Sequence, residues 1–465
     1  MLNKTNSTWP QKPLCEVVDL NPRLDKSAYR DDLEVSFVPM AAVEAGSGRM
    51  EVSQTKHFGA VKKGYTPFKE GDVLFAKITP CMENGKMAVV PKLKNDIGFG
   101  STEFHVLRPH EGIDPRYVYH FVSSHSFRRD AAHQMTGAVG QKRVPQSFLE
   151  EASIPVPFFE EQRRIVAEIE KQFSCLDEAV AALKRTKANL KRYKAAVLKA
   201  AVEGKLTEDW RKQHPDVEPA SKLLERILTE RRAKWGGKGR YKEPEEADAT
   251  GLSSLPQGWK WARLEQLGTI FGGLTKNPTR AKFTKRLPYL RVANVYANEL
   301  RLDEIEHIGV QDSELEKLLL QKGDLLVVEG NGSKDQIGRL AIWDGSIDPC
   351  VHQNHLIKVR LVIALLNKWI LFWLLSPIGR HFIEKVSSST SGLYTLSVNK
   401  VGDLPIIVPS LAEQEQIIAE VERRLSVIDK LEATVEANLT RADRLRQAIL
   451  ACAFSGQLTC PAGVA

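Results

Sequence analysis

Several short groups of residues resemble catalytic motifs, and each of them is incomplete. Gly330–Gly338 carries the glycines of a phosphate-binding loop but lacks its Lys-Ser/Thr ending. Asn21–Arg23 and Asn277–Thr279 begin as Asn-Pro but lack the second proline and the aromatic residue of a methyltransferase motif. His352 and His355 are three residues apart, yet no Cys or carboxylate ligand set stands near them in the sequence. We therefore expect no catalytic residue and no metal site in this chain.

Polar side chains in presumed loops fit binding better than catalysis. The loops adjoin β-like runs at Val73–Ile78, Lys86–Val90, Leu325–Val328 and Arg339–Trp343. Arg and Lys suit guanine edges and phosphates, whereas Asn and Gln suit adenine, at about 1–3 kcal/mol of discrimination per bidentate pair. The candidates for contact with DNA are Lys77, Asn84, Lys86, Gln141, Lys142, Arg143, Asn331, Ser333, Lys334, Gln336, Arg339, Asn354 and His355. Solvated turns contain the same residue types, which is the alternative interpretation of each candidate.

The composition is that of a soluble protein with more than one domain. The chain has 465 residues, which is more than one compact core normally holds, and its net charge of +8 suits a polyanionic partner, although many enzymes are equally basic. Six cysteines are scattered without C-x-x-C pairing, which favours the reducing cytoplasm over a disulfide framework. The most apolar stretch, Leu361–Leu375, is interrupted by Asn367 and Lys368. It predicts a buried core helix and no contact with a membrane.

The sequence contains a long internal duplication. A shift of 252 residues aligns about fifty residues without a gap, from Ile154–Pro157 on Ile406–Pro409 to Gly204 on Gly456. Within this stretch Glu161-Gln162 falls on Glu413-Gln414. Further upstream, Gly71–Leu74 matches Gly323–Leu326 at the same shift. A repeat of this length predicts two copies of one domain, each followed by a long helix.

Each copy ends in a segment with an apolar row of period seven. Such a row, sustained over five repeats, predicts a coiled-coil seam. The seam positions are Ile169, Leu176, Leu183, Leu190 and Val197 in the first copy and Val421, Ile428, Val435, Ala442 and Ile449 in the second. Pro157 and Pro409 precede the two helices, and Gly204 and Gly456 follow them. Each helix needs a partner for its seam, and we expect that partner to be the other helix, packed antiparallel.

The order of these elements and three local runs resemble a known family. The runs are Glu161–Ile169 with its copy from Glu413, Gly204–Trp210, and Pro256–Trp261. Together they resemble the specificity subunit of Type I restriction–modification systems, over nearly the whole chain. The duplicated architecture carries this resemblance more than any single motif does.

The resemblance implies an α+β fold. It consists of two tandem-duplicated α/β target-recognition domains separated by two long helices packed as an antiparallel coiled coil. The expected boundaries are 1–157 for the first target-recognition domain, 158–206 for the central helix, 207–255 for a linker, 256–409 for the second target-recognition domain, 410–459 for the C-terminal helix and 460–465 for a tail. Within the linker we expect a short helix at Ala220–Trp235 and a flexible glycine-bearing stretch at 236–240.

The resemblance also implies a function and partners. The chain would read a bipartite, asymmetric site on double-stranded DNA and would scaffold two modification subunits and restriction subunits. No cofactor is expected on this chain. S-adenosylmethionine, ATP and Mg²⁺ are expected on the partner subunits, so that the assembled complex methylates adenine and cleaves DNA with ATP.

Other functions fit parts of the same pattern. The chain could serve a different restriction or phage-defence effector, such as a fused methyltransferase–nuclease, with the same fold and different partners. A coiled-coil adaptor without a DNA role would use the helices alone. A self-contained nuclease has little support, because the catalytic motifs are incomplete.

Overall fold

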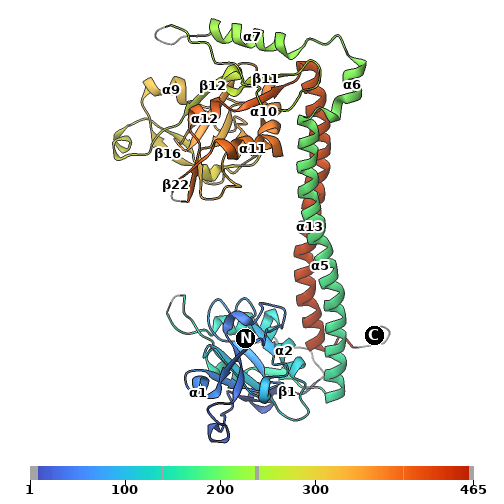
Figure 1. Cartoon of the computed structure of the whole chain (residues 1–465). Helices are drawn as coiled ribbons and strands as arrows, with labels where there is room; N and C mark the ends of the chain where they lie inside the picture. The colour runs from blue at the N-terminus through green and yellow to red at the C-terminus, as the bar shows by residue number, and fades with distance from the viewer. Residues whose placement is uncertain (1–8, 139, 236–239, 391, 460–465) are drawn as a thin grey trace. The chain divides into compact units, whose positions relative to one another are not determined.

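The computed structural model describes residues 9–138, 140–235, 240–390 and 392–459 (Figure 1). Its contacts divide the chain into two compact units, which we call the first unit (1–185 with 435–465) and the second unit (186–434). The predicted tail at 460–465 and most of the glycine-bearing stretch at 236–240 lie outside the described residues.

The first unit contains an α/β domain with two four-stranded sheets. One sheet is antiparallel with the order β2-β9-β6-β7, and the other has the order β4-β3-β8-β5, in which β3 and β8 run parallel. Phe75, Tyr117 and Leu149 share one buried cluster, which joins the first sheet to helices α2 and α4. The strands are β1 (Gln11–Pro13), which pairs with β10 (Ser153–Pro155), β2 (Val18–Leu20), β3 (Glu34–Val38), β4 (Gln54–His57), β5 (Thr66–Phe68), β6 (Val73–Ala76), β7 (Met87–Val89), β8 (Gly98–Gly100) and β9 (Phe104–Pro109). The short helices are α1 (Phe58–Val61), α2 (Pro115–Ser123), α3 (His125–His133) and α4 (Gln146–Glu151).

The second unit repeats this plan. Its antiparallel sheet has the order β12-β21-β17-β19, and a three-stranded sheet has the order β16-β13-β20, in which β13 and β20 run parallel. The strands are β11 (Lys260–Arg263), which pairs with β24 (Pro405–Val408), β12 (Gly268–Gly272), β13 (Arg286–Leu290), β14 (Val295–Tyr296), β15 (Glu299–Leu300), β16 (Glu306–Gly309), β17 (Leu325–Val328), β18 (Gly330–Asn331), β19 (Leu340–Ile342), β20 (Val351–His352), β21 (Leu356–Leu361), β22 (Ser388–Thr390) and β23 (Leu393–Thr395). The helices are α6 (Glu208–Gln213), α7 (Ala220–Ala233), α8 (Leu264–Leu267), α9 (Asp312–Leu318), α10 (Leu366–Leu375), α11 (Pro377–Val386) and α12 (Val398–Gly402).

The expected core helix forms as α10. Its Trp369 and Trp373 side chains are fully buried, and even Asn367 is only 9% exposed. Within the part of the chain that the structure describes, no helix is both long and apolar enough to cross a membrane.

A buried ion pair holds the main sheet of each unit, and the duplication preserves it. In the first unit Arg108 binds Asp72 through Nε and Nη2, at 2.8 and 2.7 Å. In the second unit Arg360 binds Asp324 through the same two nitrogens at the same two distances. Both aspartate side chains are 2% exposed. The shift of 252 residues found in the sequence therefore relates equivalent structural residues.

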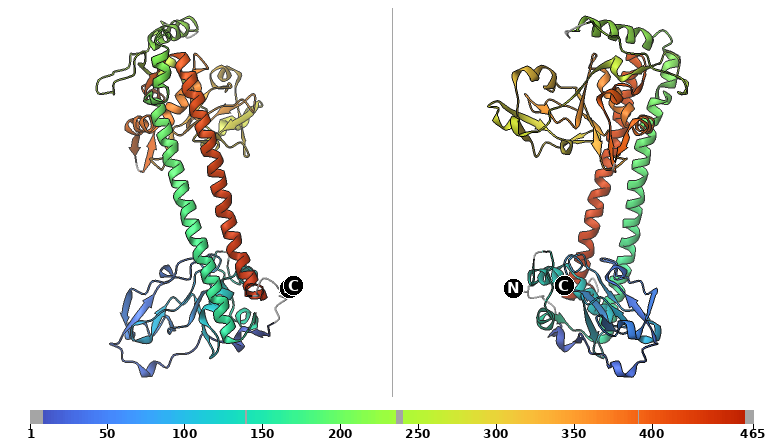
Figure 2. Two further views of the ribbon diagram at one scale, coloured as in Figure 1. Left: turned by 90° about the vertical axis from the view of Figure 1, so that its right-hand side faces the viewer. Right: turned by 60° about the vertical axis from the view of Figure 1, so that its left-hand side comes forward.

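The two long helices, α5 (Phe159–Val202) and α13 (Leu411–Ser455), pack side by side (Figures 1 and 2). In the first unit Asp177 pairs with Arg446 and Glu161 accepts a hydrogen bond from Thr459, so residue numbers fall along α5 as they rise along α13. The second unit repeats these contacts as Lys194–Asp429 and Thr207–Glu413. The helices are therefore antiparallel in both units.

The seam row lies along this helix pair. Eight of its ten side chains are buried, and Leu176 and Leu183 are partly exposed. Ile169 and Ile449 also belong to the buried cluster of the first unit's domain. The seam therefore continues into the core of the domain, which anchors the helix pair there.

At one position of α2 that contacts the long helices, the first copy has a titratable side chain where the second copy has an apolar one. His120 occupies the place that Phe372 has in the second unit. His120 is 5% exposed, and its Nδ1 has no hydrogen-bond partner among the described residues. Burial lowers the pKa of His120 to about 4. The imidazole is therefore neutral in the folded chain at neutral pH.

Replacing Asp324 by Asn should destabilise the second unit. The amide cannot neutralise Arg360 or accept both of its hydrogen bonds, and loss of a hydrogen bond to a charged group with one partner buried costs about 1.5–3 kcal/mol. Thermal unfolding followed by circular dichroism measures the effect. Asp32→Asn is the control, because its pair with Arg30 is exposed and such pairs contribute about 0–1 kcal/mol. Equal melting temperatures for the two variants would contradict the role given to Asp324.

Replacing His120 by Phe should make the chain more resistant to acid. The pKa of His120 is lower in the folded state than in the unfolded state, so the unfolded state binds more protons between pH 6.5 and 4. The stability present above pH 6.5 is lost as the pH falls through this window. At pH 5 the variant should be relieved of a loss on the order of 2 kcal/mol. Unfolding curves at pH 5 and pH 7.5 test this, and an equal pH dependence for variant and wild type would refute it.

Candidate nucleic-acid interface

In the first unit, the two predicted candidate segments lie together. Thr79 N donates to Lys142 O at 3.0 Å, and Lys142 N donates to Thr79 Oγ1 at 3.1 Å. Ile78 and Arg143 form an isolated β-bridge beside them. Residues 77–86, 136–138 and 140–143 thus form one surface, which we call the first loop pair.

The side chains of the first loop pair divide into exposed and engaged groups. Asn84, Gln141 and Lys142 are exposed, and Lys77 is partly exposed. Arg143 binds Glu103 through Nε at 2.9 Å and Nη2 at 2.8 Å, and this hydrogen bonding lowers the pKa of Glu103 and raises the pKa of Arg143. Lys86 Nζ donates to Met40 O at 3.1 Å. Asn84, Gln141, Lys142 and Lys77 can contact a ligand without breaking an ion pair. Arg143 and Lys86 instead hold the loops to the domain.

In the second unit, the predicted segments also lie together. Glu329 N donates to His355 O at 2.9 Å, and His355 Nδ1 lies 3.0 Å from Glu329 Oε2. Asn331 pairs with Tyr394, which joins β18 to the β22–β23 hairpin. Residues 329–339 and 388–395, with 353–355 beside them, form the second loop pair.

The second loop pair also contains exposed and engaged candidates. Ser333, Lys334, Gln336 and His355 are exposed, while Asn331 and Asn354 are partly exposed. Lys334 Nζ lies 3.5 Å from Glu384 Oε2, Asn331 Oδ1 accepts from Ser333 N at 2.9 Å, and Asn354 Nδ2 lies 3.4 Å from His355 Nε2.

Arg339 is the engaged residue of the second loop pair. Its Nη2 donates to Val292 O at 2.9 Å, its guanidinium lies 4.6 Å from the centre of the Tyr296 ring, and burial lowers its pKa. The position of Arg339 thus resembles that of Arg143, as a side chain that fixes the domain.

The β22–β23 hairpin is a further part of this surface that the sequence-based candidates did not include. The shift of 252 residues places Thr136–Arg143 of the first loop pair on 388–395. Thr136 and Arg143 form an isolated antiparallel bridge, β22 and β23 pair antiparallel at the equivalent place, and Leu393 is 48% exposed. The candidates included Gln141–Arg143 but not the equivalent Leu393–Thr395, because Leu, Tyr and Thr are less typical of base contacts. Applying the duplication to the candidate set would have found them.

These surfaces can hydrogen-bond to an extended polar ligand. They present amide, amine and hydroxyl groups on loops that a rigid sheet supports. Within the described part of the chain, no group of three or more His, Cys, Asp or Glu side chains is placed to hold a metal ion. Fold and site together define a class of protein with two duplicated recognition domains on an antiparallel helix pair.

Comparison with known proteins identifies the family. A family model described as the Type I restriction modification DNA specificity domain matches residues 6–191 and again residues 256–441. The chain therefore belongs to the family of Type I restriction–modification DNA specificity subunits. This confirms the resemblance that the repeated runs indicated.

Individual relatives and solved structures agree with this assignment. The chain is 30% identical over 500 aligned residues to the Type I restriction enzyme EcoAI specificity subunit of Escherichia coli, covering 95% of this chain and 82% of the relative. It is 28% identical to the EcoEI specificity subunit of the same organism, with the same coverage. A chain from a structure of a type I R-M system matches with a TM-score of 0.71 at 20% identity, over 97% of this chain and 98% of that chain. The HsdS subunit of Thermoanaerobacter tengcongensis matches with a TM-score of 0.53 at 18% identity, over 98% of both chains.

Two variants of the first loop pair should separate binding from folding. The Gln141→Ala/Lys142→Ala variant removes two exposed side chains, so DNA affinity should fall about tenfold while the melting temperature stays near that of the wild type. Arg143→Ala leaves Glu103 without its partner and should instead lower the melting temperature. Fluorescence anisotropy and thermal unfolding make the two measurements. Wild-type affinity in the double variant would remove Gln141 and Lys142 from the interface.

Proposed function

We propose that this chain reads a bipartite, asymmetric DNA site, one half with each loop pair, within a Type I restriction–modification complex. The observation that carries the proposal is that the two copies share the ion pairs that hold their main sheets but differ in their loop residues. The buried pairs Asp72–Arg108 and Asp324–Arg360 are repeated in chemistry and distance. The loop residues at equivalent positions are not repeated.

The divergence supports two different half-sites. Gln141-Lys142-Arg143 of the first loop pair corresponds to Leu393-Tyr394-Thr395 of the second. Thr79–Asn84 corresponds to Asn331–Gln336, with no identical residue at any of these positions. Because each base pair presents a distinct donor and acceptor pattern in the major groove, surfaces with different side chains select different bases.

The long helices would set the spacing between the half-sites. Each of them is continuous from one unit into the other. A spacer of fixed length makes half-site separation a property of the protein, as in dimeric DNA readers.

We further propose that two modification subunits dock on the helix pair, one on each unit. Tyr193 in the second unit and Leu445 in the first occupy equivalent positions by the 252-residue shift, and each is 50% exposed. Exposed apolar side chains at equivalent positions suit two copies of one partner. Those subunits would bring S-adenosylmethionine, and restriction subunits would bring ATP and Mg²⁺, while this chain would carry no catalytic residue. The chain's relatives are named as specificity subunits of Type I restriction enzymes, which supports this division.

Methylation sequencing tests the proposal. DNA from a host that expresses this chain with its modification partner should carry adenine methylation at a split motif, and the host without this chain should lack that motif. The Gln141→Ala/Lys142→Ala variant should change or lose one half of the motif and keep the other half and the spacing. A stable complex that methylates no split motif would refute DNA reading by this chain.

A further inference from the structure

The second unit contains a strongly basic segment, residues 267–298, next to the second loop pair. This segment holds six Lys or Arg and no Asp or Glu, which gives a formal charge of +6. The equivalent segment of the first unit, 15–46, holds three Lys or Arg and seven Asp or Glu, which gives −4. Two copies of one fold therefore differ greatly in charge at this place. The basic residues are Lys276, Arg280, Lys282, Lys285, Arg286 and Arg291.

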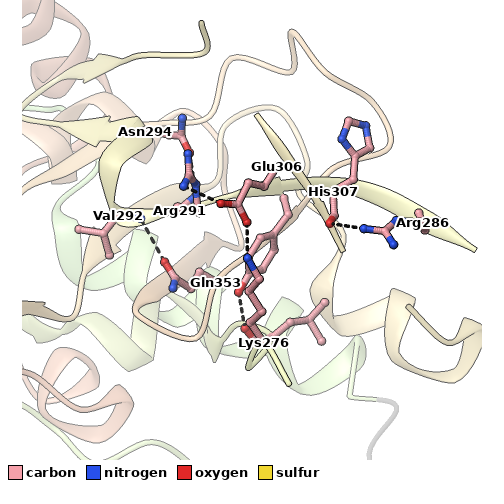
Figure 3. Close-up of polar contacts among 10 residues, drawn as sticks. Lys276, Arg286, Arg291, Val292, Asn294, Glu306, His307 and Gln353 are labelled. Atoms are coloured by element: carbon pink, nitrogen blue, oxygen red, sulfur yellow. Dashed lines mark hydrogen bonds and ion pairs between the residues drawn. The ribbon is translucent and has the colours of Figure 1, made fainter. Parts of the chain in front are cut away.

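Backbone contacts join the basic segment to the second loop pair. Leu274 and Gln353 form a parallel β-bridge, and Asn354 N donates to Leu274 O at 3.0 Å. Gln353 Oε1 accepts from Val292 N at 3.3 Å (Figure 3). Asn354 and His355 of the second loop pair therefore adjoin the basic segment at Leu274, two residues before Lys276.

Glu306 of β16 lies between two of the cations (Figure 3). Its Oε2 is 2.7 Å from Lys276 Nζ, and its Oε1 is 2.7 Å from Arg291 Nη1. One carboxylate thus serves two cations, and the trio keeps a formal charge of +1. Arg291 Nε is buried and has no hydrogen-bond partner within the described ranges.

The remaining cations divide into structural and exposed residues. Arg280 binds Glu314 through both terminal nitrogens, and only 13% of its side chain is exposed. Lys285 pairs with Asp312 at 2.7 Å. Lys276, Lys282 and Arg286 are exposed, and Arg286 Nη2 donates to the carbonyl of His307 at 3.1 Å (Figure 3). Lys285 is exposed as well but has Asp312 to itself, whereas Lys276 shares Glu306 with Arg291. Lys276, Lys282 and Arg286 are therefore the exposed cations of the segment whose charge no carboxylate of the described residues fully neutralises.

We propose that Lys276, Lys282 and Arg286 contact the phosphate backbone of duplex DNA beside the half-site that the second loop pair reads, and that the first unit has no such contact. The proposal rests on the proposed function. Phosphate contacts carry no base information and add affinity through counterion release. The two half-sites would then contribute unequally to the salt dependence of binding.

The test is the salt dependence of binding by the complex with its modification partner. Fluorescence anisotropy gives the affinity for a duplex that holds the motif mapped by methylation sequencing. Each lost phosphate contact reduces the slope of log K against log salt by about 0.9. The variant Lys276→Ala/Lys282→Ala/Arg286→Ala should therefore have a slope shallower by up to about 2.7 and about tenfold weaker binding near physiological salt. Its methylated motif should stay the same.

The matched control removes the same number of cations from the equivalent segment of the first unit. Arg23, Lys26 and Arg30 are exposed, and the triple Ala variant should keep the wild-type slope. Equal slopes for the wild type and the Lys276 variant, or equal losses in both triple variants, would overturn the inference. If the wild-type complex does not distinguish the mapped duplex from a scrambled one, the proposed function itself fails.

A second variant acts in the opposite direction. Glu306→Gln removes the carboxylate charge and releases Lys276 and Arg291. Binding should become several-fold tighter at low salt, because no carboxylate then competes with the phosphates for Lys276. Weaker binding by this variant would show that Glu306 serves the ligand rather than neutralising the cations, and would overturn the inference.

Discussion

A carboxylate in the first turn of each long helix binds the segment that follows the other long helix, and in the second unit this carboxylate is buried and also binds the entrance of the recognition domain. In the second unit Glu413 is 2% exposed and accepts hydrogen bonds from Thr207 Oγ1 at 2.7 Å, Arg211 Nε at 2.9 Å and Trp259 Nε1 at 2.7 Å. These donors come from the end of α5, from α6 and from the entrance to the recognition domain. A buried charge needs all its partners, so this contact fixes the helix register and the domain together. The first unit repeats the contact with Thr207 as a hydrogen bond from Thr459 to Glu161, whose side chain is 23% exposed.

The repeated Glu-Gln pair, at 161–162 and 413–414, therefore stabilises the fold. In both copies of Glu-Gln, the glutamate holds the end of the other helix. The glutamine donates to the carbonyl of the proline that precedes the helix, Gln162 to Pro157 at 3.0 Å and Gln414 to Pro409 at 2.9 Å. Gly204 has a φ of +71°, and a Cβ there would come within 2.8 Å of Pro256 Cγ. A side chain at this glycine would push the domain entrance away from the helix end.

The sequence predicted the features that depend on periodicity and repetition. The seven-residue apolar row gave both long helices, and the 252-residue shift gave two copies of one domain. The structure brings the candidate loops together in both units, which the sequence did not predict, and the roles of single residues could not be predicted either. Arg143 is paired with Glu103, forty positions away, and Arg339 with the Val292 carbonyl, forty-seven positions away. Such partners meet only through the tertiary fold, and no local pattern reveals them.

The ion pairs that hold the sheets and the exposed loop residues have separate roles, which would allow one fold to read different DNA sequences. Loss of a partner from a buried pair such as Asp324–Arg360 removes about 1.5–3 kcal/mol, which is a large part of the stability of a domain. Replacement of an exposed loop residue such as Gln141 or Ser333 usually changes stability by less than about 0.5 kcal/mol. Under the proposed function, base discrimination would instead depend on those exposed side chains, at about 1–3 kcal/mol each. Under that function, mutations in the loops would change the bases that are read while the fold stays intact, and the two copies could diverge independently.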